Sequence, residues 1–361
     1  GAYSESKGLG FVRKAIADFI ISRDSFDGVK QIADFEHIYL TDGASKGVQA
    51  ALTLLIAKKN DGILIPIPQY PLYSATLTLY GGQQIGYYLD EESGWSLDEQ
   101  MLENAMQEAL TKGVRVRAIV VINPGNPTGG VLNENNIRMV IRFAKKHNLT
   151  ILADEVYQEN IYKPGAHFIS FAHVMSSMQE KEVSLFSFHS VSKGFFGECG
   201  HRGGYMEVRN VPSEVVDQIT KLQSISLCAN LPGQILAYLM VSPPKPGDPS
   251  FQQFTDERNA ILTELAKRAK MLEEGLNRIS GYRCQPIDGA MYAFPSIALP
   301  SGKSDDDYCM ALLEQTGVCV VPGSGFGQKP STAHFRTTIL PPTKQIERVI
   351  DALERFHGTW K

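Results

Sequence analysis

Apolar runs and amphipathic segments alternate along the first half of the chain. Short apolar runs predict buried strands at residues 38–40, 63–66, 85–88, 118–122, 149–153 and 183–188. Apolar residues at helical spacing predict helices at residues 12–20, 48–57, 97–110 and 137–146. Strands that alternate with helices in this way are typical of a doubly wound, mostly parallel sheet packed between helices.

The pattern changes near residue 243. Residues 243–249 read Pro-Pro-Lys-Pro-Gly-Asp-Pro, a stiff polar link of the kind that joins domains. Beyond it we predict a long helix at 251–279, a closing amphipathic helix, and short strands around 282–284, 291–294, 318–321 and 334–338. We therefore predict a large α/β domain over residues 1–245 and a smaller α+β domain over residues 246–361.

Composition narrows the class of protein. The chain has 361 residues, 43% hydrophobic and 20% charged, which suits a globular protein with two domains. The net charge of −4 and the lack of a basic block argue against nucleic acid as a partner. No apolar run approaches the roughly 20 residues that span a bilayer, so no membrane is predicted. Five widely spaced cysteines without a Cys-x-x-Cys pair indicate free thiols, with neither a disulfide framework nor a metal site.

A turn of small residues follows the strand at 38–40. Gly43-Ala44-Ser45 leads directly into the helix predicted from residue 48. Backbone N–H groups at a helix N-terminus point at an anion, and the helix dipole favours negative charge there. The turn therefore suits a phosphate, although Ser45 could equally be an ordinary N-cap.

A lysine lies just beyond the strand at 183–188, in Ser190-Val191-Ser192-Lys193-Gly194. In open α/β sheets, ligands bind outside the carboxyl ends of the strands. A lysine amine there can form a Schiff base with a carbonyl, such as the aldehyde of pyridoxal phosphate (PLP). The hydroxyls of Ser190 and Ser192 and the guanidinium of Arg202 would suit its phosphate. The alternatives are a solvated lysine and the Ser-x-x-Lys arrangement of serine acyltransferases.

Three further features follow predicted strands. Asp154 ends the strand at 149–153, and a buried unpaired carboxylate is costly. It either caps the next turn or pairs with a cation such as a protonated pyridine nitrogen, with Tyr157 nearby. Tyr70, held among prolines, could stack on a flat ring or belong to the core. The loop at 123–130 contains two Asn-Pro steps and three glycines, so it needs an unusual backbone, for which a cis proline is one option.

Taken in order, these features resemble the fold-type-I PLP-dependent aminotransferases over nearly the whole chain. Each motif is weak by itself, but the ordered set is specific. The motifs are Gly43-Ala44-Ser45, Tyr70, Asn126-Pro-Thr-Gly129, Asp154-x-x-Tyr157, Ser190-x-Ser-Lys193, Arg202 and Arg336. Residues 66–73, 123–129, 197–205 and 322–327 are similar to the alanine aminotransferase subgroup, which includes the plant glutamate–glyoxylate aminotransferases.

The resemblance implies roles for the residues nearest the chemistry. Lys193 would hold PLP as an internal aldimine and carry a proton between the substrate Cα and the cofactor. Asp154 would pair with the pyridine nitrogen, and Asn126 and Tyr157 would hydrogen-bond the 3′-oxygen. Arg336, with Asn126, would bind the substrate α-carboxylate bidentately. The catalytic set is thus Lys193, Asp154 and Tyr157.

The resemblance also implies how the rest of the cofactor is held. Tyr70 would stack on the ring, while the amide of Ala44, the hydroxyls of Ser45 and Ser190, and the guanidinium of Arg202 would bind the phosphate. These residues come from segments far apart in the sequence. They would converge on one cofactor only if the sheet folds as predicted.

Tyr3 matches a family tyrosine that reaches the phosphate of the partner subunit, which implies a homodimer with shared sites. Family members begin well before the position of Gly1, so we expect the arm that grips the partner to be absent from this chain. The stretch at 299–307 also looks shorter than its family counterpart. The free cysteines fit a cytoplasmic location, with the mitochondrion or peroxisome as alternatives.

The expected activity is ping-pong exchange between amino acids and 2-oxo acids, with L-alanine and 2-oxoglutarate giving pyruvate and L-glutamate. A glutamate–glyoxylate aminotransferase is the alternative within the same mechanism. A PLP-dependent lyase or synthase on the same scaffold is a further alternative. A regulatory pseudoenzyme is disfavoured because Lys193, Asp154 and Arg336 are all present.

Overall fold

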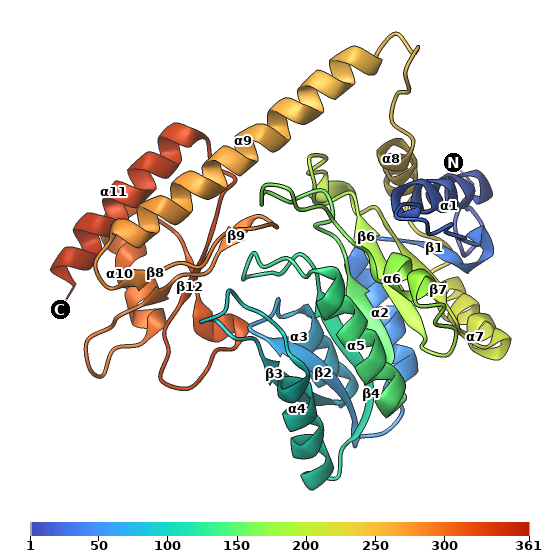
Figure 1. The fold of residues 1–361 in the computed structure, drawn as a ribbon, viewed down its shortest axis with the longest axis horizontal. Coiled ribbons are helices and arrows are strands. Elements are labelled where there is room, and N and C mark those ends of the chain that lie inside the picture. The colour runs from blue at the N-terminus through green and yellow to red at the C-terminus, as the bar shows by residue number, and fades with distance from the viewer. Residues whose placement is uncertain (1, 361) are drawn as a thin grey trace.

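The computed structural model describes residues 2–360 and has a seven-stranded sheet in the order β1-β7-β6-β5-β4-β2-β3 (Figure 1). Its strands are β1 (Ile38–Thr41), β2 (Asp61–Ile67), β3 (Gln83–Tyr88), β4 (Arg115–Ile122), β5 (Thr150–Asp154), β6 (Leu185–Ser190) and β7 (Gly204–Arg209). Only β7 runs antiparallel to its neighbours among these strands, so the predicted mostly parallel sheet is confirmed.

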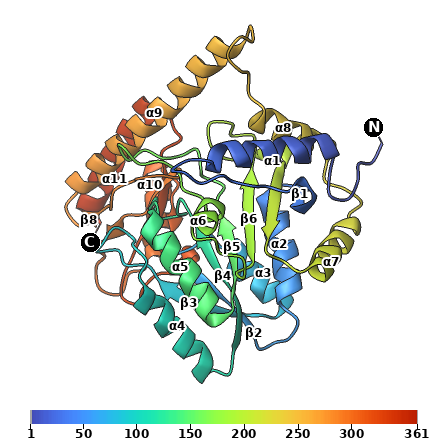
Figure 2. The same ribbon diagram turned by 45° about the vertical axis from the view of Figure 1, so that its right-hand side comes forward.

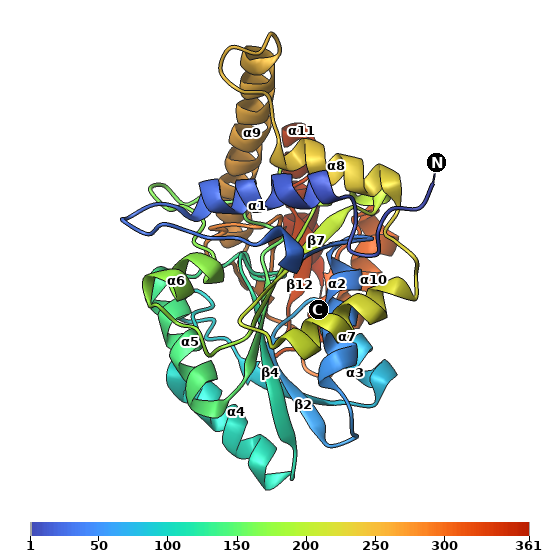
Figure 3. The ribbon, with the colours of Figure 1, turned by 90° about the vertical axis from the view of Figure 1, so that its right-hand side faces the viewer.

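Helices cover both faces of this sheet. They are α1 (Gly10–Asp24), α2 (Ala44–Leu55), α3 (Leu72–Tyr80), α4 (Glu99–Thr111), α5 (Glu134–His147), α6 (Phe171–Ser177), α7 (Ser213–Ser224) and α8 (Leu231–Val241). Helices α4, α5 and α6 lie on one face and α2, α3 and α7 on the other (Figure 3). Helices α1 and α8 pack together beside β1 and β7 (Figure 2).

Helix α5 illustrates why these elements form where they do. Its residues Ile137, Val140, Ile141 and Ala144 are fully buried, and this spacing places them on one face toward the sheet. The helix begins with a capping box in which Asn133 and Asn136 bond each other's backbone. The strands beneath are buried on both faces, which explains their continuous apolar runs.

The C-terminal part builds smaller sheets against long helices. Its elements are α9 (Phe251–Arg278), β8 (Tyr282–Arg283), β9 (Tyr292–Ala293), β10 (Ser296–Ile297), α10 (Asp305–Thr316), β11 (Val321–Pro322), β12 (Phe335–Thr338) and α11 (Thr343–Thr359). Strands β8 and β10 form one pair, and β11, β12 and β9 form a second sheet. A core of its own lies under α9, α10 and α11.

The sequence expectations agree with most of these elements but miss some. The strand predicted at 318–321 lies later, at β11. Helices α3, α6, α7, α8 and α10 and strands β7 and β10 were not predicted. Helix α7 buries only Ile219 completely, which leaves a faint apolar pattern. The stiff link lies between α8 and α9 (Figure 1), and the domain boundary near residue 245 stays a prediction. Among residues 2–360, no helix combines the length and apolar character needed to cross a bilayer.

Candidate active site

Three parallel neighbours, β4, β5 and β6, end at the same edge of the sheet. Ile122 pairs with Asp154, and Asp154 pairs with Phe188, so the loops that follow these strands meet. The loops border a cavity of about 320 Å³, within the usual range for ligand pockets. The predicted site residues that line it are Ala44, Ser45, Tyr70, Asn126, Asp154, Tyr157, Ser190, Lys193, Arg202 and Arg336. Tyr3 does not line it, and its side chain is 77% exposed.

The start of α2 provides backbone donors at one end of the cavity. The N-cap of the helix is Gly43, with φ of 77° and no side-chain cap, so the first N–H groups remain available. Ser45 lies inside the first turn, and the interpretation of it as a plain N-cap is therefore wrong. The guanidinium of Arg202 donates to Asp42 O at 3.2 Å and Ser45 Oγ at 3.4 Å. A side chain at Gly43 would overlap this guanidinium. The arrangement suits an anion.

Among residues 2–360, Asp154 provides the only carboxylate that lines the cavity. The Tyr73 hydroxyl donates to its Oδ2 at 2.9 Å. Its Oδ1 is buried and has no hydrogen-bond partner among the described residues. Burial raises the pKa of Asp154, while the hydrogen bond from Tyr73 and the charge of Lys193 limit the rise. A buried carboxylate oxygen without a donor is costly, so the site suits a ligand that brings an N–H or a cation.

Sequence reasoning missed Tyr73. Burial and the Asp154 carboxylate raise the pKa of Tyr73 well above the usual range, so its hydroxyl stays protonated and donates a hydrogen bond to Asp154. Tyr73 is the second residue of α3 and lies three positions after Tyr70 in the sequence. The proline-rich loop that drew attention to Tyr70 was the one available signal, but nothing in the loop indicates a contact with β5.

A polar chain crosses the cavity from the C-terminal part to the sheet. Arg336 on β12 donates from Nη1 to Asn126 Oδ1 at 3.3 Å, and Asn126 Nδ2 donates to the Tyr157 hydroxyl at 3.2 Å. Burial, Tyr292 and Asp154 raise the pKa of Tyr157 well above the usual range, so Tyr157 stays protonated. Within residues 2–360, neither Arg336 nor Lys193 forms an ion pair with a carboxylate.

The loop that carries Asn126 is tightly packed. Both of its Asn-Pro peptide bonds, at 123–124 and 126–127, are cis, as the sequence allowed. Gly129 has φ of 74°, and a Cβ there would lie 3.2 Å from the Tyr292 carbonyl oxygen. The glycine therefore lets the loop approach β9, which places Asn126 beside Arg336.

The loop that carries Lys193 is held by backbone contacts. The Gly194 N–H donates to Asn160 Oδ1 at 2.9 Å, and the Val191 N–H donates to Gly203 O at 3.1 Å. The Lys193 Nζ lies 5.3 Å from the centre of the Tyr157 ring. The amine thus faces the same cavity as Asp154 and Arg202.

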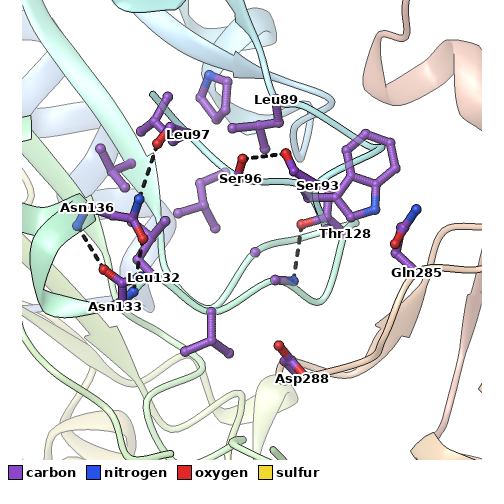
Figure 4. Close-up of a pocket in the computed structure, with 18 of the residues that line it drawn as sticks. Leu89, Ser93, Ser96, Leu97, Thr128, Leu132, Asn133, Asn136, Gln285 and Asp288 are labelled. Atoms are coloured by element: carbon purple, nitrogen blue, oxygen red, sulfur yellow. Dashed lines mark hydrogen bonds between the residues drawn. The ribbon is translucent and has the colours of Figure 1, made fainter. Parts of the chain in front are cut away.

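A second cavity of about 430 Å³ lies beside the Asn126 loop, and Figure 4 shows its lining. Its polar groups largely satisfy one another: Ser93 Oγ and Ser96 Oγ are 2.6 Å apart, and Asn136 Nδ2 donates to Leu97 O. Its one lysine, Lys163, is paired with Asp288 at 3.0 Å. The cavity that contains Lys193 is therefore the better candidate for chemistry.

Comparisons with known proteins agree with this site and fold. The sequence profile described as Aminotransferase class I and II matches residues 1–353. Alanine aminotransferase 1, mitochondrial, of Arabidopsis thaliana is 52% identical over 100% of this chain and 68% of its own. Glutamate–glyoxylate aminotransferase 2 of Arabidopsis thaliana is 49% identical over 99% of this chain and 76% of its own.

A solved structure has a similar fold. The alanine aminotransferase from Pyrococcus furiosus superposes with a TM-score of 0.84 at 29% identity, over 99% of this chain and 84% of its own. The profile match and these relatives define the class: an enzyme that transfers amino groups. The chain belongs to the class I and II aminotransferase family.

Proposed function

We propose that this aminotransferase moves the amino group of L-alanine to 2-oxoglutarate, giving pyruvate and L-glutamate. The observation that carries transamination is the cavity in which the Lys193 amine, the Asp154 carboxylate and the Arg336 guanidinium lie together. The choice of alanine is supported by relatives named alanine aminotransferases, at 52% identity in Arabidopsis thaliana and 51% in Dictyostelium discoideum. Both substrates would use the same cavity in turn.

The residues of the cavity fit PLP. The uncapped start of α2 with Arg202 suits a phosphate, and the unpartnered Oδ1 of Asp154 suits a protonated ring nitrogen. The Lys193 amine faces the same space and suits an aldehyde. When bound, PLP supplies the carbonyl that binds an amine and a ring that stabilises negative charge at the substrate Cα.

Four side chains carry the proton chemistry in this proposal. The Lys193 amine would take the proton from the substrate Cα and return it to the carbon that was the aldehyde carbon of the cofactor. Asp154 holds a proton at the ring nitrogen. Tyr157 remains protonated in its buried setting, so with Asn126 it can donate to the 3′-oxygen of the cofactor.

The remaining residues of the cavity hold the cofactor and orient the substrate. The Ala44 amide, the Ser45 and Ser190 hydroxyls and Arg202 bind the phosphate, and Tyr70 stacks on the ring from the open side of the cavity, where it is 44% exposed. In the substrate position, Arg336 binds the α-carboxylate through two parallel hydrogen bonds. This contact places Cα within reach of Lys193.

The proposal predicts a reversible half-reaction. Purified protein with PLP should show the absorbance band of the lysine-bound cofactor, L-alanine should remove the band, and 2-oxoglutarate should restore it. The measurement is an absorbance spectrum before and after each addition, with product analysis for pyruvate and L-glutamate. A band that L-alanine leaves unchanged would contradict alanine as the donor.

Glutamate–glyoxylate exchange is the second candidate, because two relatives with that name are 49% and 48% identical to this chain. A panel of oxo acids added to the amino-loaded enzyme separates the two. Faster restoration of the band by glyoxylate than by pyruvate or 2-oxoglutarate would favour the second candidate. Release of ammonia would instead indicate a lyase.

Tyr73→Phe should weaken the proposed contact of Asp154 with the cofactor. Loss of a hydrogen bond to a buried carboxylate is worth about 1.5–3 kcal/mol, so PLP affinity and kcat/KM should fall roughly 10- to 150-fold. Tyr87→Phe is the matched control, because the Tyr87 hydroxyl donates to Val120 O at 2.7 Å and does not contact Asp154. PLP titration and steady-state kinetics decide; equal effects of the two substitutions would contradict the role of Tyr73.

We also propose a homodimer in which Tyr3 serves the partner's phosphate site. In support, Tyr3 is 77% exposed and Ile225 is 76% exposed, and Ile225 and Tyr80 line a groove beside the start of α2. Burial of such apolar surface is typical of subunit contacts.

Shared sites predict complementation between two damaged subunits. Tyr3→Ala and Lys193→Ala subunits should each be poorly active at limiting PLP. Coexpressed in equal amounts, they should regain about a quarter of wild-type activity, because half of the dimers contain one intact site. Activity no higher than the sum of the separate variants would contradict sharing, and analytical ultracentrifugation reports the oligomeric state directly.

The compartment also stays a prediction. The cytoplasmic location expected from the free cysteines competes with the mitochondrion, which appears in the names of the Arabidopsis thaliana and Dictyostelium discoideum relatives.

A further inference from the structure

Tyr292 lies in the candidate site although no sequence motif indicated it. It is half-buried on β9, lines the cavity with Lys193 and Arg336, and pairs through its backbone with Thr338 of β12. Its carbonyl oxygen abuts Gly129 of the Asn126 loop. Tyr292 therefore touches both the C-terminal sheet and the loop at the end of β4.

The ring of Tyr292 faces the guanidinium of Arg336. The Arg336 Cζ lies 4.3 Å from the centre of the Tyr292 ring and 4.7 Å from that of Phe326. Both distances are within the range of cation–π attraction. Two aromatic rings thus restrict the guanidinium, which is long and flexible when unsupported.

Tyr292 also lines the same cavity as Lys193. The Tyr157 and Tyr292 rings are 6.1 Å apart at 84°, and the Lys193 Nζ lies over Tyr157. Burial alone would raise the pKa of Tyr292, but the charges of Lys193 and Arg336 lower it. The pKa of Tyr157 is raised instead, with Asp154 contributing. Tyr292 is therefore the phenol that best accommodates negative charge opposite the two cations.

We propose that Tyr292 is a positioning residue that couples the carboxylate-binding arginine to the reactive lysine. This inference rests on the proposed function, in which Arg336 binds the substrate carboxylate and Lys193 moves the Cα proton. The ring keeps the Arg336 guanidinium aligned for the carboxylate. The hydroxyl oxygen accepts a hydrogen bond from the Lys193 amine and holds it toward the substrate Cα.

Two substitutions separate the role of the Tyr292 hydroxyl from the aromatic support of Arg336. Tyr292→Phe keeps the ring and removes the hydroxyl, so kcat should fall about tenfold while KM for L-alanine changes less than about twofold. Phe326→Leu keeps the Tyr292 hydroxyl and removes one aromatic neighbour of Arg336, so KM should rise about three- to tenfold with kcat nearly unchanged. Tyr238→Phe is the matched control: Tyr238 is also half-buried, packs on Phe11, and lies outside the cavity.

A second readout needs neither cofactor nor turnover. The tyrosinate absorbance of cofactor-free wild type minus that of Tyr292→Phe, followed against pH, reports the ionisation of Tyr292. It should ionise below the usual value of about 10. The same difference measured in a Lys193→Met background should move to higher pH, because the positive charge is gone. A purely structural tyrosine would not respond to Lys193→Met.

The outcomes distinguish this inference from the proposed function. A wild-type enzyme that transaminates, together with a Tyr292→Phe variant of unchanged kcat, would overturn the inference alone. An ionisation of Tyr292 that ignores Lys193→Met would overturn it even if the wild type proved inactive. If Tyr292→Phe fails to fold, Phe326→Leu still tests the arginine half, and an unchanged KM there would overturn that half.

Discussion

Replacing Lys193 by alanine should abolish transamination, with kcat lower by more than about 10⁴-fold, because the proton transfer at Cα loses its only amine. Lys193 is the only lysine that lines the candidate cavity among the described residues. The absorbance band of lysine-bound cofactor should disappear as well. Steady-state kinetics and a spectrum with added PLP measure both effects.

Lys245→Ala is the control for this substitution. Lys245 is exposed in the link between α8 and α9 and lies outside the cavity, so its loss should leave turnover and the absorbance band unchanged. Because the phosphate and Asp154 contacts do not involve Lys193, PLP should still bind to the Lys193→Ala variant, with lower affinity. Turnover of that variant near the wild-type rate would refute the assignment of Lys193.

Replacing Arg336 by alanine should lower kcat/KM for L-alanine about 10³-fold, because a buried carboxylate loses two charge-assisted hydrogen bonds. PLP affinity should change less than about threefold, since Arg336 lies at the substrate end with Asn126. The kcat/KM of Arg336→Lys should lie between those of the wild type and Arg336→Ala, because lysine keeps the charge but cannot form the bidentate contact. Kinetics and PLP titration on the three proteins measure the series.

An amine without a carboxylate provides an internal control. Ethylamine has no group for Arg336 to bind, so Arg336→Ala should change its slow reaction with the loaded enzyme far less than that of L-alanine. An equal loss for both amines would show that the substitution damages the site in general and would remove Arg336 from the substrate contact. An unchanged kcat/KM for L-alanine would do the same.

Most of the sheet could be predicted from the sequence, because the apolar run of a buried strand depends only on the residues of that strand. Strands such as β2 and β6 are buried along their whole length, so each is a continuous apolar run whatever its neighbours are. Helix α5 shows the apolar spacing and capping residues of an isolated amphipathic helix. Helices α7 and α8 could not be found this way, because α7 buries one face weakly and α8 is apolar on several faces.

The positions of several site residues directly after strands could also be predicted from the sequence. Lys193, Asp154 and the Gly43 turn each follow a predicted strand, and parallel strands place their carboxyl ends together. The structure brings them to one cavity with Arg202 and Arg336, while their catalytic roles stay proposals. The interpretation of Ser45 as an N-cap was wrong because Gly43 adopts the capping position, which local sequence preferences do not reveal.

By itself, therefore, the sequence determined β1 to β6, their alternation with helices and the residues that follow each of these strands, since these depend on neighbours along the chain. Only the tertiary structure decided which side chains from distant parts of the chain come into contact. Tyr73 reaches Asp154 over 81 residues, and Arg336 reaches Asn126 over 210. The contact of Tyr292 with Arg336 depends on how β9 and β12 pack against the Asn126 loop. No periodicity encodes such contacts, because they arise from packing between segments whose separation in sequence is arbitrary.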